Sequence, residues 1–404
     1  KLEAEIAQVQ NNPLFLRAFE WRFEFPEVLD NEGNFIGFDV IIGNPPYISN
    51  KEIKPLQKEF FQTYQTAKLQ YDLFSLFIEK SVILLRQNGI GSYIIPDSFL
   101  ARSTFKTIRE YLYHNTTLYK LLQIDNVFDE AAVSSCVIFF TKSLLNNPKP
   151  IEYLKTKNAK TFEAHEIETK QINYLTHEKI NSYRLLFIDE HELKLLIKLF
   201  QNIPFETHIH IWRGEEIGKK SSLISENQFD STMLPIITGE NIERYYFKGK
   251  IKFISQSSIL KDTIQYNKPK IFIRQLGTSI HAHLAEGNII TTQSVYCLYS
   301  VNQKYSNEII LAILNSKLTH FIYKCVFAEK QQFPRILIEN IRNLVLPQPN
   351  EKIFKQIKVL VDKILSLKRQ DQQADTSGLE AEIDRLVYAL YDLTETEIKI
   401  IERA

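Results

Sequence analysis

This sequence of 404 residues contains few cysteines and a single methionine, and its positive and negative charges nearly cancel. Its 49 Lys and Arg residues offset 48 Asp and Glu residues and leave a net charge of +1. A nearly neutral chain has no overall attraction for a polyanion, so any nucleic-acid surface must be a local patch. The three cysteines, Cys136, Cys297 and Cys325, lie far apart in apolar stretches, which favours reduced core thiols in a cytoplasmic protein over a disulfide framework.

Long hydrophobic runs are also absent, so we expect no membrane span, and the first residues, Lys1 to Glu5, are not a signal peptide. Met233 is the only methionine, and the chain begins with lysine. We therefore expect a processed or excised piece of a longer protein. The apolar share of 44% is ample for buried cores, and the length suits two or three domains.

What the sequence does contain is an apolar stretch that ends in a stiff corner. Residues 38–43, FDVIIG, predict a buried strand of parallel type, and Asn44-Pro45-Pro46-Tyr47 follows directly. Each proline fixes its own φ and keeps the preceding residue out of the helical region, so Asn44 and Pro45 are held extended. An amide and an aromatic ring thus stand where a strand of an open α/β sheet ends, which is where such sheets bind ligands. A plain turn after a strand is the alternative interpretation.

Strands that alternate with helices after this corner predict a partial, doubly wound, Rossmann-like α/β sheet. The expected elements are a loop over 50–67, helices over 71–85 and 99–113, and strands over 90–95, 118–124 and 133–140. A linker at 146–150 precedes a helix over 190–201 and short strands over 209–212, 234–238, 250–254, 270–274 and 295–298, which predict a mixed α+β domain. Helices over 354–368 and 377–390, and one that starts at Thr394, form a helical tail.

The corner resembles the Asn-Pro-Pro-Tyr motif of adenine-specific DNA methyltransferases. This resemblance implies that the Asn44 side-chain oxygen and the Pro45 carbonyl accept the hydrogens of the adenine amino group and localise its lone pair. The amine can then attack the methyl group of S-adenosylmethionine, with positioning and preorganised acceptors supplying most of the rate. The resemblance also implies that Tyr47 stacks on an adenine flipped out of the duplex.

Two later segments extend the resemblance to methyltransferases of the TaqI type. Residues 71–77 and 89–96 look like the segment after the motif, which implies that Phe77 packs against the adenine of the cofactor; we assign Pro46 to the same site. Residues 127–134 resemble the motif whose Phe stacks on the flipped base, a role that falls to Phe128. Taken singly, such aromatic residues are more often core residues.

The sequence lacks the motifs that would bind most of the cofactor. Enzymes of this kind bind S-adenosylmethionine through a Gly-rich turn and acidic strand ends that precede the motif, whereas only Gly33 and Gly37 stand before Asp39 here. We therefore expect the C-terminal part of a larger methyltransferase or fused restriction-modification enzyme. The cofactor half would come from the same polypeptide or from a separate chain, and the isolated piece would not methylate DNA.

A basic stretch in the second half predicts a surface for double-stranded DNA. Residues 244–274 hold eight Lys or Arg residues and one acid, Asp262, with Tyr245, Tyr246, Phe247 and Tyr266 interleaved. A solvated basic surface is the alternative. Residues 234–242, 270–278, 311–316 and 333–335 look like the TaqI-type specificity domain, which implies readout of base edges in the grooves. Our candidates for this surface are Arg244, Lys270, Arg274, Gln275, Thr278, Gln332 and Arg335.

Together these patterns divide the chain into residues 1–148, the C-terminal part of a catalytic domain, residues 149–350, a target-recognition domain, and residues 351–404, a helical tail. They predict a site-specific DNA adenine methyltransferase of a restriction-modification system. The alternative is a non-catalytic specificity subunit that retains the corner. The pairs His208/His210 and His281/His283 lack a third ligand at suitable spacing, so no metal site is expected.

Overall fold

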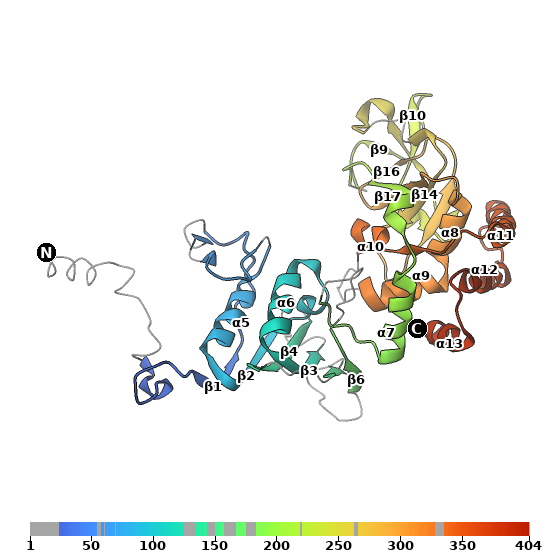
Figure 1. The fold of residues 1–404 in the computed structure, drawn as a ribbon. Coiled ribbons are helices and arrows are strands. Elements are labelled where there is room, and N and C mark those ends of the chain that lie inside the picture. The colour runs from blue at the N-terminus through green and yellow to red at the C-terminus, as the bar shows by residue number, and fades with distance from the viewer. Residues whose placement is uncertain are drawn as a thin grey trace. The chain divides into compact units, whose positions relative to one another are not determined.

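A computed structural model describes residues 24–54, 58–59, 61–68, 70–124, 134–143, 150–156, 167–174, 183–218, 220–261, 266–327 and 335–403. The chain divides into two compact units, residues 1–99 with 103–169, and residues 100–102 with 170–404 (Figure 1).

A six-stranded sheet with the strand order β1-β2-β4-β3-β5-β6 forms the centre of the first unit. The strands are β1 (Phe38–Gly43), β2 (Leu85–Pro96), β3 (Thr117–Ile124), β4 (Ser135–Thr141), β5 (Ile151–Thr156) and β6 (Glu168–Ile172). β1 pairs parallel with β2 and β3 pairs parallel with β5, whereas β4 lies antiparallel between β2 and β3. The carboxyl ends of β1, β2 and β3 therefore meet at one edge of the sheet. The expected boundary at residue 148 falls between β4 and β5 of this sheet.

Two helices make the crossovers between the parallel strands. α5 (Leu73–Leu84) connects β1 to β2, and α6 (Lys106–Asn115) lies between β2 and β3 in the chain; the two helices pack against each other (Figure 1). Buried apolar residues at helical spacing, such as Phe74 and Ile78, form the inner face of α5. The predicted α/β alternation is confirmed. The helix expected from residue 99 begins only at Lys106, after two short 3-10 turns over 97–100 and 103–105.

The expectation that β1 is a buried strand is wrong. β1 is parallel, as predicted, but Val40 is 49% exposed and Ile42 is 76% exposed. Apolar parallel strands are buried where other elements cover both faces of the sheet. Among the described residues, β2 is the one strand that pairs with β1, so β1 forms an edge of this sheet.

Short strands in several sheets dominate the second unit. Two sheets have four strands each, in the orders β16-β10-β13-β9 and β15-β14-β17-β8, and two pairs, β11-β12 and β18-β7, stand beside them. The bounds are β7 (Ile203–Pro204), β8 (Ile209–Arg213), β9 (Ile224–Ser225), β10 (Met233–Ile237), β11 (Ile242–Glu243), β12 (Tyr246–Phe247), β13 (Lys252–Ser255), β14 (Lys270–Arg274), β15 (Ala282–Ala285), β16 (Ile290–Thr291), β17 (Val295–Ser300) and β18 (Val345–Leu346). All five strands predicted in this half are present.

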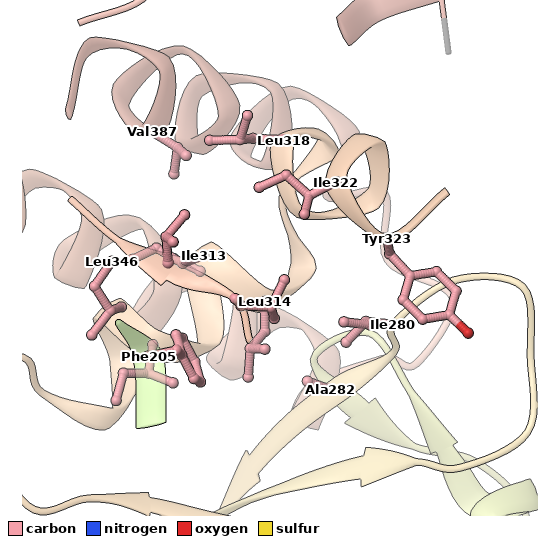
Figure 2. Close-up of a cluster of buried hydrophobic side chains, with 14 of the residues drawn as sticks. Phe205, Ile280, Ala282, Ile313, Leu314, Leu318, Ile322, Tyr323, Leu346 and Val387 are labelled. Atoms are coloured by element: carbon pink, nitrogen blue, oxygen red, sulfur yellow. The ribbon is translucent and has the colours of Figure 1, made fainter. Parts of the chain in front are cut away.

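Seven α-helices complete the described part of the second unit: α7 (Glu190–Phe200), α8 (Asn307–Asn315), α9 (Lys317–Ile322), α10 (Ile338–Arg342), α11 (Glu351–Gln370), α12 (Ser377–Leu390) and α13 (Glu395–Arg403). Their apolar faces share one buried core, in which Val387 of α12 lies with Leu318 of α9 (Figure 2). The tail thus packs on the preceding elements, as its helical spacing predicted. The helix predicted to start at Thr394 is α13, and Thr394 and Glu397 cap it by exchanging backbone-to-side-chain hydrogen bonds of 2.8 and 3.3 Å. At the start of α12, the Thr376 hydroxyl donates to the Glu380 carboxylate at 2.8 Å.

In the described part of the chain, no single helix has the length and apolarity needed to cross a membrane. The bent pair of α8 with residues 317–327 passes that test only as a pair, by length and composition. Its apolar side chains are buried in the core of the second unit.

Candidate functional site

The proline-locked corner lies at the carboxyl edge of the first sheet, directly after β1. Asn44 and Pro46 are exposed, Pro45 is buried and Tyr47 is half-buried. The Tyr47 hydroxyl donates a hydrogen bond of 3.1 Å to the carbonyl of Ile94, near the end of β2. Burial raises the pKa of this hydroxyl, so it stays protonated and able to donate. The corner is thereby tied to the neighbouring strand while Asn44 stays exposed.

Gly43, the last residue of β1, leaves room for an aromatic ring of the neighbouring strand. It stands opposite Tyr93 in the parallel register of β1 and β2. A Cβ atom at Gly43 would lie 2.8 Å from Cε1 of the buried Tyr93 ring, which is closer than real Cβ contacts come. The absence of a side chain therefore allows the aromatic ring to pack beneath the last residue before Asn44.

A chain of polar side chains at the same edge was not predicted from the sequence. The Gln123 amide donates to the Asp97 carboxylate at 3.1 Å, and the buried Tyr153 hydroxyl donates to the Gln123 oxygen at 2.9 Å. These residues come from β3, β5 and the turn that follows β2. Asp97 had one usable signal, because it follows the strand-ending Pro96 directly. Hydrogen bonding of this kind holds the polar edge in one arrangement.

Of the aromatic residues assigned to the cofactor and to the flipped base, the structure describes Phe77 but not Phe128. Phe77 on α5 is 46% exposed, so it does not belong to the buried face of that helix. Buried Glu79 of the same helix accepts the backbone N–H groups of Gln65 and Thr66 at 2.8 Å each, which ties the segment after the corner to α5. Phe128 lies outside the described residues.

Lys270 is a correction to the predicted DNA surface. Its side chain is buried, and its ammonium group donates to the carbonyls of Tyr266, Lys268 at 3.2 Å and Gly287 at 3.0 Å. Burial lowers the pKa of Lys270 to about 8. An ammonium group enclosed by three carbonyls fastens the start of β14 and cannot reach a phosphate.

Other members of the basic stretch also have internal partners. Arg244 donates to the Asn315 carbonyl at 2.6 Å and forms an ion pair of 2.9 Å with Glu380 of α12, so it joins the β11–β12 turn to two helices. Tyr245 and Tyr266 are 1% and 0% exposed, so neither offers a ring to a base. The interleaving of aromatic and basic residues in the sequence therefore does not persist on the surface at these positions.

Arg274, in contrast, borders a cavity of about 430 Å³ in the second unit. Gln275, next in the chain, is buried, and its amide donates to the Tyr296 hydroxyl at 2.9 Å. Thr278 is exposed. Arg335 is exposed and pairs with Leu276 in an isolated antiparallel bridge, whereas Gln332 lies outside the described residues. The cavity is lined by Ile217, Gly218, Thr238, Gly239, Glu240, Lys248, Arg274, Leu276, Thr292, Gln293 and Ser294.

Neither His-x-His pair assembles a metal site in the described chain, where no three His, Cys, Asp or Glu side chains gather at ligand distance. His281 contacts Glu243 and Ser279, and His283 packs edge-on against Phe247.

Both units contain a segment that is similar to a known protein family. Residues 2–128 match the Eco57I restriction-modification methylase family, and residues 234–346 match the TaqI-like C-terminal specificity domain. The segment that is similar to the methylase family includes the corner at residues 44–47. The segment that is similar to the specificity domain includes Arg274 and most of the residues that line the cavity beside it.

Individual relatives agree with this combination. The chain is 29% identical to a putative type II restriction enzyme and methyltransferase of Methanocaldococcus jannaschii, over 93% of this chain and 32% of the relative. It is 25% identical to the type II methyltransferase M.AccI of Acinetobacter calcoaceticus, over 78% of this chain and 64% of the relative. It thus spans about a third of the first relative and less than two thirds of the second.

A solved structure has the same fold over most of the chain. The type IIL restriction-modification enzyme MmeI, solved in complex with DNA, aligns with 94% of this chain and 57% of its own, with a TM-score of 0.63 and 13% sequence identity. At this identity the likeness concerns the fold: a methyltransferase-like sheet followed by a mixed domain and helices.

Proposed function

We propose that this chain supplies the adenine-holding corner and the target-reading domain of a type II restriction-modification DNA methyltransferase specific for adenine. The observation that carries the proposal is the exposed Asn44 in a corner locked by two prolines, at the carboxyl edge of a methyltransferase-like sheet. Its occurrence in one chain with a TaqI-like specificity domain supports the same function.

The chemistry of the corner follows from what an exocyclic amine needs. Its lone pair is delocalised into the adenine ring, so two fixed acceptors, the Asn44 side-chain oxygen and the Pro45 carbonyl, would hold both hydrogens and localise the pair. Because the amine is enclosed in a duplex, the base must be flipped out, and the half-buried Tyr47 ring would offer it a stacking surface. The hydrogen bond from Tyr47 to Ile94 supports this role, since it fixes the ring before the base arrives.

S-adenosylmethionine would supply the methyl group. The described residues fit part of such a site: Phe77 is an exposed aromatic side chain on α5, and Pro46 is exposed in the corner. Val40 and Ile42 on edge strand β1 are apolar and exposed to solvent. Their exposure supports the expectation that a further half of the sheet covers this strand and binds most of the cofactor. The isolated chain would then be inactive.

Double-stranded DNA is the proposed partner of the second unit. The solved relative in complex with DNA and the cavity beside Arg274 support this assignment. Because Lys270 is withdrawn from the surface and Arg244 is paired, we assign the contacts to Arg274, Thr278 and Arg335, with Gln332 assigned by resemblance alone. Phe128, in the segment similar to the methylase family, is assigned by resemblance alone to stack on the flipped base.

The test joins this chain to a cofactor half and measures transfer of labelled methyl groups to DNA. Asn44→Ala should abolish transfer, because one of the two amine acceptors is lost, and should leave DNA binding unchanged. Asn343→Ala, at another exposed asparagine, is the matched control and should keep full activity. If Asn44→Ala methylates DNA as well as the parent, the corner is not catalytic and the chain acts as a specificity module.

A further inference from the structure

Three side chains of the second unit, to which the proposed function gives no role, form a hydrogen-bonded chain. The Ser279 hydroxyl lies 3.0 Å from Nε2 of His281, and Nδ1 of the same ring lies 2.7 Å from Oε2 of Glu243. A hydroxyl, an imidazole and a carboxylate that are linked in this order through the two ring nitrogens are the arrangement with which proteins activate a serine as a nucleophile.

The positions of the protons in this chain follow from the charge of Glu243. Lys248 donates to Oε1, and Nη1 of Arg274 lies 3.5 Å from the same oxygen, so Oε2 is left to the imidazole. Burial alone would raise the pKa of Glu243, but the bonds from Lys248 and His281 lower it below its ordinary value. Because an ionised carboxylate only accepts, the His281 proton lies on Nδ1, and Nε2 accepts from the Ser279 hydroxyl.

Asn315 of α8 fixes the backbone beside both His281 and Glu243. Its side chain accepts the N–H of Ala282 at 3.0 Å and donates to the carbonyl of Ala282 at 2.9 Å, directly after His281. Its own carbonyl accepts from Arg244, directly after Glu243, at 2.6 Å. Asn315 and Ala282 are both buried. Rigid support of this kind keeps the imidazole within hydrogen-bond reach of its two partners.

Ser279 and His281 are accessible to a small molecule without being fully exposed. Ser279 is half-buried, and the side chain of His281 is 21% exposed. In the described part of the chain, the backbone N–H groups of Thr278 and Ser279 donate to no other group. Covalent geometry places the Ser279 N–H next to its own hydroxyl, so a free donor stands beside the oxygen that would attack, where an oxyanion needs one.

His281 is in its neutral form at neutral pH. Burial and the charges of Arg274 and Arg244 lower its pKa from 6.5, against the opposing hydrogen bond and charge of Glu243. A neutral imidazole is the form that can accept the Ser279 proton. The base is therefore available at pH 7 and is lost only as the solution becomes acidic.

We propose that Ser279 is a nucleophile, that His281 is its general base, positioned by Glu243, and that the second unit hydrolyses small activated carboxylic esters. Oγ of Ser279 bonds to the carbonyl carbon while its proton passes to Nε2 of His281. The bond from this carbon to the leaving oxygen then breaks, and the imidazolium gives its proton to that oxygen. Water attacks the acyl group in the same way, releases the acid and restores the Ser279 hydroxyl. This activity does not depend on the proposed methyltransferase function.

A fluorophosphonate probe tests the nucleophile in the unaltered full chain. Oγ of an activated serine bonds to phosphorus and fluoride leaves, so the label is permanent and mass spectrometry of a digest locates it. We expect the label on Ser279 in the folded chain and no label after unfolding in urea. A folded chain without label on Ser279 would overturn the proposal. This result does not depend on whether any variant folds.

Hydrolysis of p-nitrophenyl acetate separates catalysis from a structural role. Ser279→Ala should lower the rate by about 100- to 10,000-fold, and Glu243→Gln should lower it as well, because the imidazole loses the partner that holds its proton on Nδ1. Ser257→Ala is the matched control and should keep the parent rate, since this exposed hydroxyl lies 2.9 Å from the hydroxyl of Ser255.

The dependence of this hydrolysis on pH gives an independent measurement. The parent rate should fall on the acid side with a midpoint below pH 6.5, because a protonated His281 cannot accept the serine proton. Equal rates in the parent and in Ser279→Ala at every pH would mean that the three side chains only hold the structure together.

Discussion

His283 makes the stability of the second unit depend on pH. It lies on β15 with its ring edge-on to Phe247, at 4.3 Å between centroids, and its Nδ1 has no partner among the described residues. Burial lowers the pKa of His283 from 6.5 to about 4, opposed in part by a hydrogen bond to the Tyr245 backbone and assisted by the charge of Arg369. The folded unit therefore holds a neutral imidazole in a range of pH where the unfolded chain binds a proton.

The sign and size of the effect follow from this difference. The contribution of neutral His283 to the free energy of unfolding is fully present above the unfolded pKa of 6.5. It is lost as pH falls towards 4, because the unfolded state then binds a proton that the folded state does not. Each pKa unit corresponds to about 1.4 kcal/mol. Between pH 8 and pH 5, His283 alone should therefore lower the free energy of unfolding by about 2 kcal/mol, and by about 3 kcal/mol at pH 4.

Urea unfolding from pH 8 to pH 4, followed by the fluorescence of Trp212, measures this directly. A Trp21→Phe background leaves Trp212, on β8, as the only tryptophan in the chain. His283→Gln should remove about 2 kcal/mol of the loss between pH 8 and pH 5. His210→Gln, at an exposed histidine of β8, should leave the loss unchanged. Equal pH dependence in the parent and His283→Gln would refute the reasoning.

Two other predictions concern the corner and the DNA surface. Gly43→Ala should destabilise the first unit by about 1–3 kcal/mol, because the added methyl group meets the Tyr93 ring at 2.8 Å; thermal unfolding checks this against Gly378→Ala, where a Cβ atom meets nothing within 4 Å. Lys270→Met should leave the salt dependence of DNA binding unchanged, because the buried ammonium group contacts no phosphate. Removal of a phosphate-contacting lysine would instead lower the slope of log K against log salt by about 1, and a titration of binding at several salt concentrations distinguishes the two.

The corner at residues 44–47 could be placed from the sequence because its causes are local. An apolar run followed by two prolines limits the backbone whatever surrounds it, and the order of strands and helices follows from their spacing. The exposure of Val40 and Ile42 could not be predicted in this way. Burial of a strand depends on which elements cover it, and the apolar pattern records only that it is suited to being covered.

The sequence of the basic stretch, residues 244–274, likewise does not show which of its charged side chains are buried. Lys270 and Arg274 are four residues apart on one strand, and the sequence gives them equal standing as DNA contacts. One is enclosed by the carbonyls of Tyr266, Lys268 and Gly287, and the other borders a cavity lined by residues that lie between 217 and 294 in the chain. The cluster of Glu243, His281 and Arg274 was likewise hidden, since its members stand on β11, β14 and the segment before β15. Only pairing of these strands brings them together.

Among the described residues no strand pairs with the outer edge of β1, and this has a practical consequence for anyone who purifies this polypeptide. The outward N–H and C=O groups of β1 are a template for another strand, and Ile42 beside them is 76% exposed. Without a covering domain, copies of the chain should adhere to one another through this edge as concentration rises. Co-expression with the proposed cofactor-binding half should then improve the yield of dispersed protein.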